Sequence, residues 1–200
     1  MKIKIPVIST MLMFSAQVSA QEDCEVHIFP TTNVEILNKL GSYGALSEAL
    51  AGASPSKDTI LNQLSSDIQI DAVRSTLGKD QRFVGYQFIA QEKTIDYKTA
   101  VKNKTRLTSS NAICYLEIAM VSIVFSDSAL TSKKIGIMAV VREFDQGSDN
   151  PKIKKLGGAS KLESFPQEDK ATADAQSFDY ADGFQNAFKQ SVLKFWKSKP

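Results

Sequence analysis

Apolar residues fill both alternating sets of positions between residues 112 and 126, a stretch that contains neither glycine nor proline. Its β-branched and aromatic residues predict a long strand. One face would carry Ile113, Tyr115, Ala119, Val121, Ile123 and Phe125, and the other Cys114, Leu116, Ile118, Met120 and Val124. A strand that is apolar on both faces is normally covered on both. We therefore expect it to be central in its sheet, with residues 135–144 as its hairpin partner.

The pattern along the rest of the chain predicts further strands at 24–29 and 82–91 and a C-terminal helix at 173–197. Helical spacing predicts a broken helix at 33–53 and a helix at 57–77, which Ser65–Asp67 could split, with Ser66 as a cap. The polar, lysine-rich residues 92–110 fit a short helix or an exposed loop. Residues 145–172 predict a long surface loop, in which 152–156 could form a short strand.

These elements predict one α+β domain over residues 21–200. Its sheet is expected to be mainly antiparallel, with four or five strands and with the helices packed on one face. The 180 residues are an ordinary length for a single domain.

The first 20 residues predict a cleaved secretory signal peptide. Lys2 and Lys4 precede an apolar run, and Ala20 precedes a polar break, where we place the cleavage. A membrane anchor is the alternative, but the apolar run is short and interrupted for a span of about 20 residues. Lipid attachment at Cys24 is disfavoured because Glu22 and Asp23 precede it. We expect a soluble protein of the periplasm or the exterior.

Charge and cysteine content further limit the possible partners and metal sites of the protein. Without Lys2 and Lys4, basic and acidic residues balance, which gives no reason to expect a nucleic-acid partner. The two cysteines, Cys24 and Cys114, are too few for a zinc cluster and form no Cys-x-x-Cys pair. In an oxidising compartment they predict one disulfide. Two buried free thiols are the alternative.

Two residues are candidates for acid–base chemistry. His27 is the only histidine, so a general base or metal ligand would lack a histidine partner, and a structural role is favoured. Glu117 is the one charge inside the long strand and could be a perturbed acid or base. Pairing with Arg142 is favoured, because an odd-sum hairpin register puts the two on one face and an unpaired buried charge is costly.

A basic cluster and an aromatic residue could form an interaction surface. The cluster comprises Lys152, Lys154, Lys155 and Lys161, and Gly157 and Gly158 lie within it. It lacks the Gly-Lys-Ser/Thr ending of a phosphate-binding loop, so a solvated basic loop is the default, with anionic lipid headgroups as an alternative. Trp196 is the residue of the last helix most expected to be exposed. We predict no catalytic residue, no metal site and no cofactor.

One resemblance rests on residues 111–117, which include Cys114, Tyr115 and Glu117, on the two long strands, and on an early Cys-x-Val-His strand at 24–27. In these features the chain resembles a group of uncharacterised exported bacterial proteins, which bring no known activity. The order of elements is also similar, at fold level, to small domains of ABC-transporter auxiliary lipoproteins of the cell envelope. The chain departs from those by lacking a lipidation cysteine at its mature start.

These features favour a non-enzymatic accessory or interaction protein of the bacterial cell envelope, acting through residues 145–172 and an edge of the sheet. The alternative is a soluble periplasmic carrier of a small apolar ligand or lipid, held between the helices and the sheet. An enzyme ranks third. The expected partners are accordingly an envelope protein or an apolar ligand.

Overall fold

The computed structural model describes most of the chain after residue 23. The described residues are 24–38, 55–128, 131–145, 148, 150–162, 164–165 and 177–197. The expected signal peptide and the side chain of Trp196 lie outside this set. Within it, the protein has the expected α+β fold.

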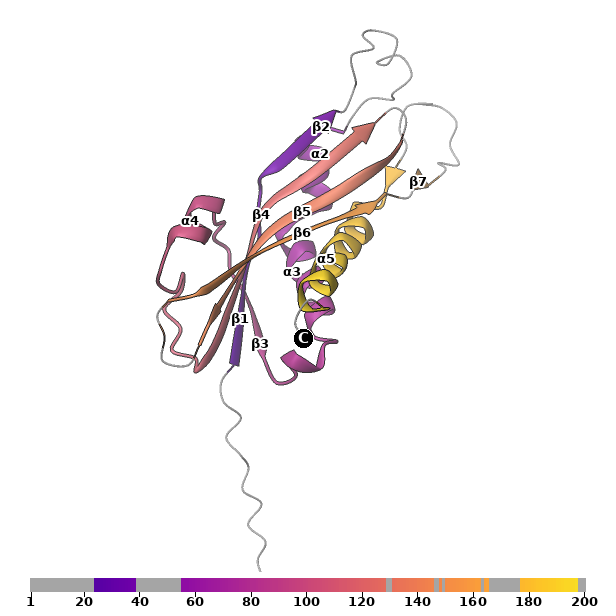
Figure 1. The fold of residues 1–200 in the computed structure, drawn as a ribbon. Helices are drawn as coiled ribbons and strands as arrows, with labels where there is room; N and C mark the ends of the chain where they lie inside the picture. Colours follow the sequence, from indigo (N-terminus) through magenta and orange to yellow (C-terminus); the bar gives the residue numbers. More distant parts are fainter. Residues whose placement is uncertain are drawn as a thin grey trace, which may run out of the picture.

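In the described part of the chain, six strands form one sheet (Figure 1). Its central strand is β4, Cys114–Ser128, which pairs antiparallel with β5, Thr131–Phe144. On its other side β5 pairs antiparallel with β6, Lys152–Lys161. The predicted long strand and its hairpin partner are therefore confirmed.

The remaining strands of this sheet are parallel to their neighbours. β1, Cys24–Phe29, and β2, Val34–Asn38, lie one after the other along the same edge of β4, and β3, Gln87–Ala90, pairs with β1. The sheet is thus mixed, and the expectation of a mainly antiparallel sheet is wrong. β4 is long enough, at 15 residues, to pair with two short strands in succession. Helical connections then allow parallel pairing, which local alternation does not reveal.

Three segments differ from their predicted type. Of the strand predicted at 82–91, only residues 87–90 form a strand, and residues 82 and 83 lie in a short 3₁₀ helix. Residues 34–38 form β2 instead of the start of a broken helix, because short apolar runs fit both periods; residues 39–54 lie outside the described set. Residues 152–161 form β6, so the predicted loop at 145–172 contains a ten-residue strand. Two short strands, β7, Ser164–Phe165, and β8, Ser177–Phe178, pair separately.

The helices begin at clear capping residues. Ser56 caps α2, Lys57–Gln63, and Ser65 caps α3, Ser66–Leu77. The predicted split is confirmed, but the cap is Ser65 rather than Ser66. Asp96 caps α4, Tyr97–Lys102, while a short 3₁₀ helix, η1, spans Gln81–Phe83. The predicted C-terminal helix is α5, Tyr180–Lys197. In the described residues, no helix is both long and apolar enough to cross a membrane.

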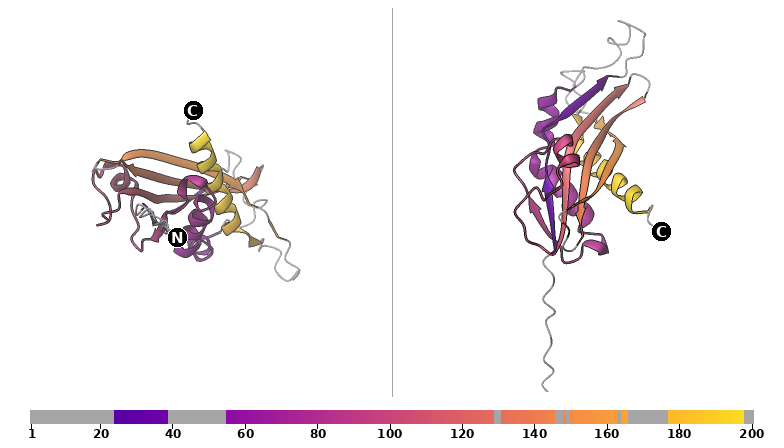
Figure 2. Two further views of the ribbon diagram at one scale, coloured as in Figure 1. Left: turned by 90° about the horizontal axis from the view of Figure 1, so that it is seen from below. Right: turned by 60° about the vertical axis from the view of Figure 1, so that its left-hand side comes forward.

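The helices lie on both faces of the sheet, not on one. α3 and α5 cover one face, and α4 lies on the other side (Figure 1, Figure 2). The larger apolar core fills the α3–α5 face and includes Val26, Ile28, Val73, Leu77, Ile118, Ile123, Phe125, Ile135, Phe184 and Phe188. A smaller cluster lies under the α4 segment and consists of Phe29, Ile95, Ala100, Ala119, Val121 and Val140.

A β-bulge at Val121 changes the alternation of β4. Met120 lies opposite Ala139 and Ser122 opposite Met138, so Val121 is the extra residue. Beyond it, Ile123 and Phe125 join the core of the α3–α5 face with Leu116. The predicted faces are therefore correct before the bulge and exchanged after it.

The predicted disulfide is present. Cys24 lies opposite Cys114 in the β1–β4 pairing, and their Cα atoms are 4.6 Å apart. The bond joins residues 90 positions apart and fixes the start of β1 to the start of β4.

Candidate functional site

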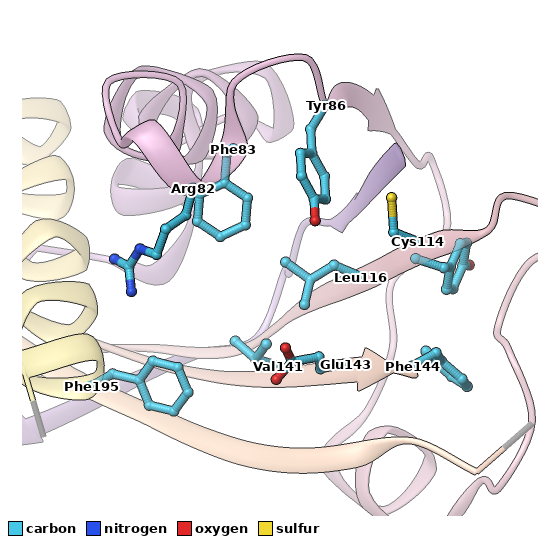
Figure 3. A pocket seen from close by; sticks show the side chains of 10 residues that line it. Arg82, Phe83, Tyr86, Cys114, Leu116, Val141, Glu143, Phe144 and Phe195 are labelled. Atoms are coloured by element: carbon cyan, nitrogen blue, oxygen red, sulfur yellow. The ribbon is translucent and has the colours of Figure 1, made fainter. Parts of the chain in front are cut away.

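A cleft with a volume of about 260 Å³ lies between η1, the end of α5 and the sheet (Figure 3). Leu116 and Val141 project into it from β4 and β5. Phe83 and Tyr86 line one side and Phe195 the other. The cleft therefore has an apolar interior made from three parts of the chain that are far apart in sequence.

Local structure around η1 positions the two aromatic residues of the cleft. The Asp80 carboxylate accepts a hydrogen bond from the backbone N–H of Arg82 at 3.1 Å and also pairs with its guanidinium. Gly85 follows with φ of 86°, a conformation that favours glycine, and turns the chain toward Tyr86. The rings of Phe83 and Tyr86 then meet edge to face, with centroids 5.3 Å apart.

Charged groups of both signs surround the apolar interior. Lys154 Nζ lies 3.5 Å from Glu143 Oε2 and 4.8 Å from the ring centroid of Phe195. Burial, and then the negative charge of Glu143, raise the pKa of Tyr86 above its ordinary value. An apolar cavity with a few polar groups at its border is the usual form of a small-ligand site. This arrangement can hold the apolar part of a ligand while a polar end stays at the border.

The sequence candidates Glu117 and Arg142 meet on the opposite face of the sheet, where they form the expected ion pair. They lie directly opposite each other in β4 and β5, and both side chains are fully buried. The Glu117 carboxylate also accepts hydrogen bonds from Tyr115 Oη, at 2.8 Å, and from the backbone N–H of Leu107. Burial raises the pKa of Glu117, and these partners oppose that rise.

Arg142 joins this ion pair to the segment that precedes β4. Its Nη2 donates to the carbonyl oxygens of Asn103, at 2.9 Å, and Thr105, at 2.7 Å. Burial lowers the pKa of the guanidinium and the charge of Glu117 opposes that change. Glu117 and Arg142 are thus engaged in holding residues 103–107 against the sheet.

His27 lies beside this pair and has its own partners. Its Nε2 lies 2.7 Å from Glu25 Oε2, and its Nδ1 lies 3.0 Å from Gln91 Nε2. A neutral ring with the proton on Nε2 satisfies both contacts. Glu25 also accepts a hydrogen bond from Ser110. Burial acts to raise the pKa of Glu25, but the hydrogen bonds from Ser110 and His27, together with nearby positive charge such as that of Arg106, outweigh it, so that the pKa lies below its ordinary value.

The lysine cluster is divided between the two faces of β6. Lys154 lies opposite Val141, whose side chain belongs to the α3–α5 core, whereas Lys155 lies opposite Val140 on the α4 face. Lys152 pairs with Asp145 at 2.7 Å, and Lys155 Nζ lies 5.1 Å from the ring centroid of Tyr97. Lys161 is exposed at the end of the strand. The four lysines therefore do not converge on one anion site.

The hydrophobic pattern of the sequence did not predict the aromatic residues that line the cleft. Phe83, Tyr86 and Phe195 come together only through tertiary packing.

Gln69, outside the cleft, is buried on α3, where its side chain hydrogen-bonds to both the N–H and the C=O of Thr31 at 2.9 Å. Its position one turn before Val73 in the apolar stripe is the signal that could have marked it as a buried polar residue. In the described part of the chain, no group of three or more His, Cys, Asp or Glu residues could hold a metal ion.

Comparisons with known proteins identify no family. No protein-family model matches the chain, and no curated protein matches it. Among solved structures, a hypothetical protein, CT253, from Chlamydia trachomatis is 10% identical with a TM-score of 0.36, covering 86% of this chain and 95% of that one. An uncharacterised protein is 11% identical with a TM-score of 0.29, covering 90% and 100%. Likenesses this weak carry no argument about function.

Proposed function

We propose that the protein is a non-enzymatic, exported protein of the bacterial cell envelope whose cleft carries a small apolar ligand. The cleft between η1, α5 and the sheet is the observation that supports this function. Leu116, Val141 and Phe195 supply an apolar interior, and Arg82 and Glu143 supply charged groups at its border, where Lys154 pairs with Glu143. This favours the carrier, the second hypothesis from the sequence, over the accessory role.

Two features support the remaining parts of the proposal, which are export and a non-enzymatic role. The sequence of residues 1–20 and the Cys24–Cys114 disulfide fit export, because disulfides persist in oxidising compartments. His27 and Glu117, the two acid–base candidates, are occupied in hydrogen bonds that hold the chain together. Their engagement supports a binding role rather than catalysis.

Titration with three eight-carbon probes, octanoate, octylamine and octanol, tests the cleft. We expect at least one to bind in calorimetry, with a preference that reports which charge at the border meets the polar end. Leu116→Phe should fill the cleft and weaken binding about tenfold, and a thermal unfolding curve would show that the variant is folded. Leu193→Phe, at an exposed position of α5, is the matched control. Failure of all three probes to bind, or equal binding by Leu116→Phe, would contradict the proposal.

An accessory role keeps support from one observation, the position of β6. This strand ends the described sheet, and its ten residues include four lysines. An extended acidic segment of an envelope protein fits such an edge, by strand addition and by charge. Amine-reactive cross-linking in the native host should then capture one protein at Lys155 or Lys161, and Lys155→Glu with Lys161→Glu should abolish the capture. Capture unchanged by these substitutions would contradict strand addition at β6.

A further inference from the structure

A second pocket, with a volume of about 330 Å³, lies on the α4 face of the sheet. Its walls come from the connection between β1 and β2, from the start of α4, and from the middle of the β4–β5 hairpin. It is separate from the cleft described above, which opens on the α3–α5 face. Three features of its lining identify the chemistry of an occupant.

The first feature is a buried hydroxyl at the β-bulge. Ser122 lines the pocket and is only 2% exposed, and its Oγ has no hydrogen-bond partner among the described residues. Buried polar groups are nearly always paired, so an unpaired one calls for an explanation. The neighbouring carbonyl of Val121 is already used, since it accepts from Thr31 Oγ1 at 3.2 Å and Asn33 Nδ2 at 3.3 Å. The Ser122 hydroxyl is therefore an enclosed group beside the pocket without a described partner, and a ligand hydroxyl that reached it would supply that partner.

The second feature is a set of exposed acceptors at the border. Asp96 and Glu35 both line the pocket, and both are exposed. Asp96 accepts from the backbone N–H of Thr99 at 3.0 Å and from the Thr99 hydroxyl at 2.6 Å, and a carboxylate can accept further hydrogen bonds beyond these two. Ligand hydroxyls can donate to these oxygens.

The third feature is a flat, partly exposed apolar surface. Tyr97 is 37% exposed and Met138 is 43% exposed, and both line the pocket. Lys155 Nζ already lies 5.1 Å from the Tyr97 ring centroid, so this ring has a cation of the chain beside it. The resident lysine disfavours a cationic ligand at the ring, and the two carboxylates disfavour an anionic one.

We infer that this pocket binds a neutral, hydroxyl-rich ring, which is the chemistry of a saccharide. Ring hydroxyls would donate to Asp96 and Glu35 and exchange a hydrogen bond with Ser122, while the C–H face would pack on Tyr97 and Met138. The same chemistry could come from a free monosaccharide or from a longer glycan of the cell surface. Because Glu35 and Asp96 are exposed residues of the lining, a longer chain could extend outward past them.

Calorimetry and saturation-transfer NMR with glucose, N-acetylglucosamine and chitotriose test this inference, with choline as the cationic comparison. We expect a sugar to bind and choline not to. Tighter binding of chitotriose than of N-acetylglucosamine would assign a glycan, and equal binding a free monosaccharide. No response to any of the three sugars, or preferential binding of choline, would overturn the inference.

Two substitutions separate a binding role of Ser122 from a structural one. Ser122→Ala should weaken sugar binding at least about fivefold, the loss expected for one hydrogen bond. Its midpoint of urea unfolding should not fall, because the hydroxyl has no partner within the described structure. Thr76→Val removes another buried hydroxyl without a described partner, on α3 away from the pocket, and should leave binding unchanged. Equal sugar binding by Ser122→Ala and the unmodified protein would overturn the inference.

Discussion

The two faces of the sheet bury their residues by different means. The α3–α5 face is filled by aliphatic and aromatic side chains such as Ile118, Phe125 and Phe184. The other face buries Glu117 and Arg142 completely, beside His27, under a segment with few large apolar residues. The first face depends on the area and fit of apolar surfaces, and the second depends on its buried charged groups keeping their partners. Substitutions on the two faces should therefore fail in different ways.

Removing one partner of the buried ion pair should have the largest effect. Arg142→Met leaves the Glu117 carboxylate buried without its counter-charge, and frees the carbonyls of Asn103 and Thr105. Uncompensated buried charges typically cost about 3–5 kcal/mol. Urea unfolding should show a loss of this size in the free energy of unfolding.

A double substitution separates charge from volume at this pair. With Glu117→Met added to Arg142→Met, the unpaired charge is gone, so the double variant should lose less stability than the two single losses combined. A change within about 0.5 kcal/mol for Arg142→Met alone, the range of ordinary surface substitutions, would contradict the importance of the pair.

Two adjacent glycines test the fit of the apolar face. A Cβ at Gly158 would clash with the carbonyl oxygen of Ala187 in α5, whereas a Cβ at Gly157 meets no atom within 4 Å. Gly158→Ala must displace α5 from β6 and should cost about 3 kcal/mol, at the upper end for an overpacked site. Gly157→Ala should be close to neutral. Equal effects of the two substitutions on the free energy of unfolding would show that α5 does not pack closely here.

The local pattern could predict the features that depend on neighbouring residues alone. The run of β-branched and aromatic residues predicted β4 and β5, the spacing of phenylalanines predicted α5, and the charge of Glu117 inside an apolar strand pointed to Arg142. Parallel pairing of β1 and β2 with β4 could not be read this way, because it depends on where the helices return the chain. In the sequence Gly158 resembled a loop residue. A glycine is needed there because Ala187, in a different element, lies too close to leave room for a side chain. For the same reason the sequence did not predict which residues line either pocket, although the carrier hypothesis placed a ligand between the helices and the sheet.

A buried glutamine shows that the apolar face also depends, at one position, on polar groups that keep their partners. Gln69 bonds both backbone groups of Thr31 and the carbonyl of Leu64, each at 2.9 Å. Gln69→Met keeps the length of the side chain but leaves these buried backbone groups unpaired, so we expect a loss of about 2 kcal/mol. Gln63→Met, at an exposed position of α2, is the control. If both variants unfold at the same urea concentration, the bonds to Thr31 do not stabilise the fold.

The smallest predicted effect concerns pH and the polar face. The pKa of Glu25 lies below its ordinary value in the folded protein, because the hydrogen bonds from Ser110 and His27, together with nearby positive charge, outweigh burial. Its carboxylate therefore stabilises the fold above its ordinary, unfolded pKa, and this contribution is lost as the pH falls through the lower, folded pKa. Glu25→Gln should cost about 1 kcal/mol at pH 6, a value reduced from that of a buried charged hydrogen bond because the side chain is partly exposed.

The difference between Glu25→Gln and the unmodified protein should shrink as the pH is lowered through the folded pKa of Glu25. Urea unfolding of the oxidised protein at a series of pH values measures it, and Glu92→Gln, at an exposed position, should show no such trend. A difference that stays constant with pH would mean that Glu25 stabilises the fold through its shape alone. A difference that shrinks would mean that the polar face, unlike the apolar one, weakens in acid through a carboxylate that the fold holds ionised.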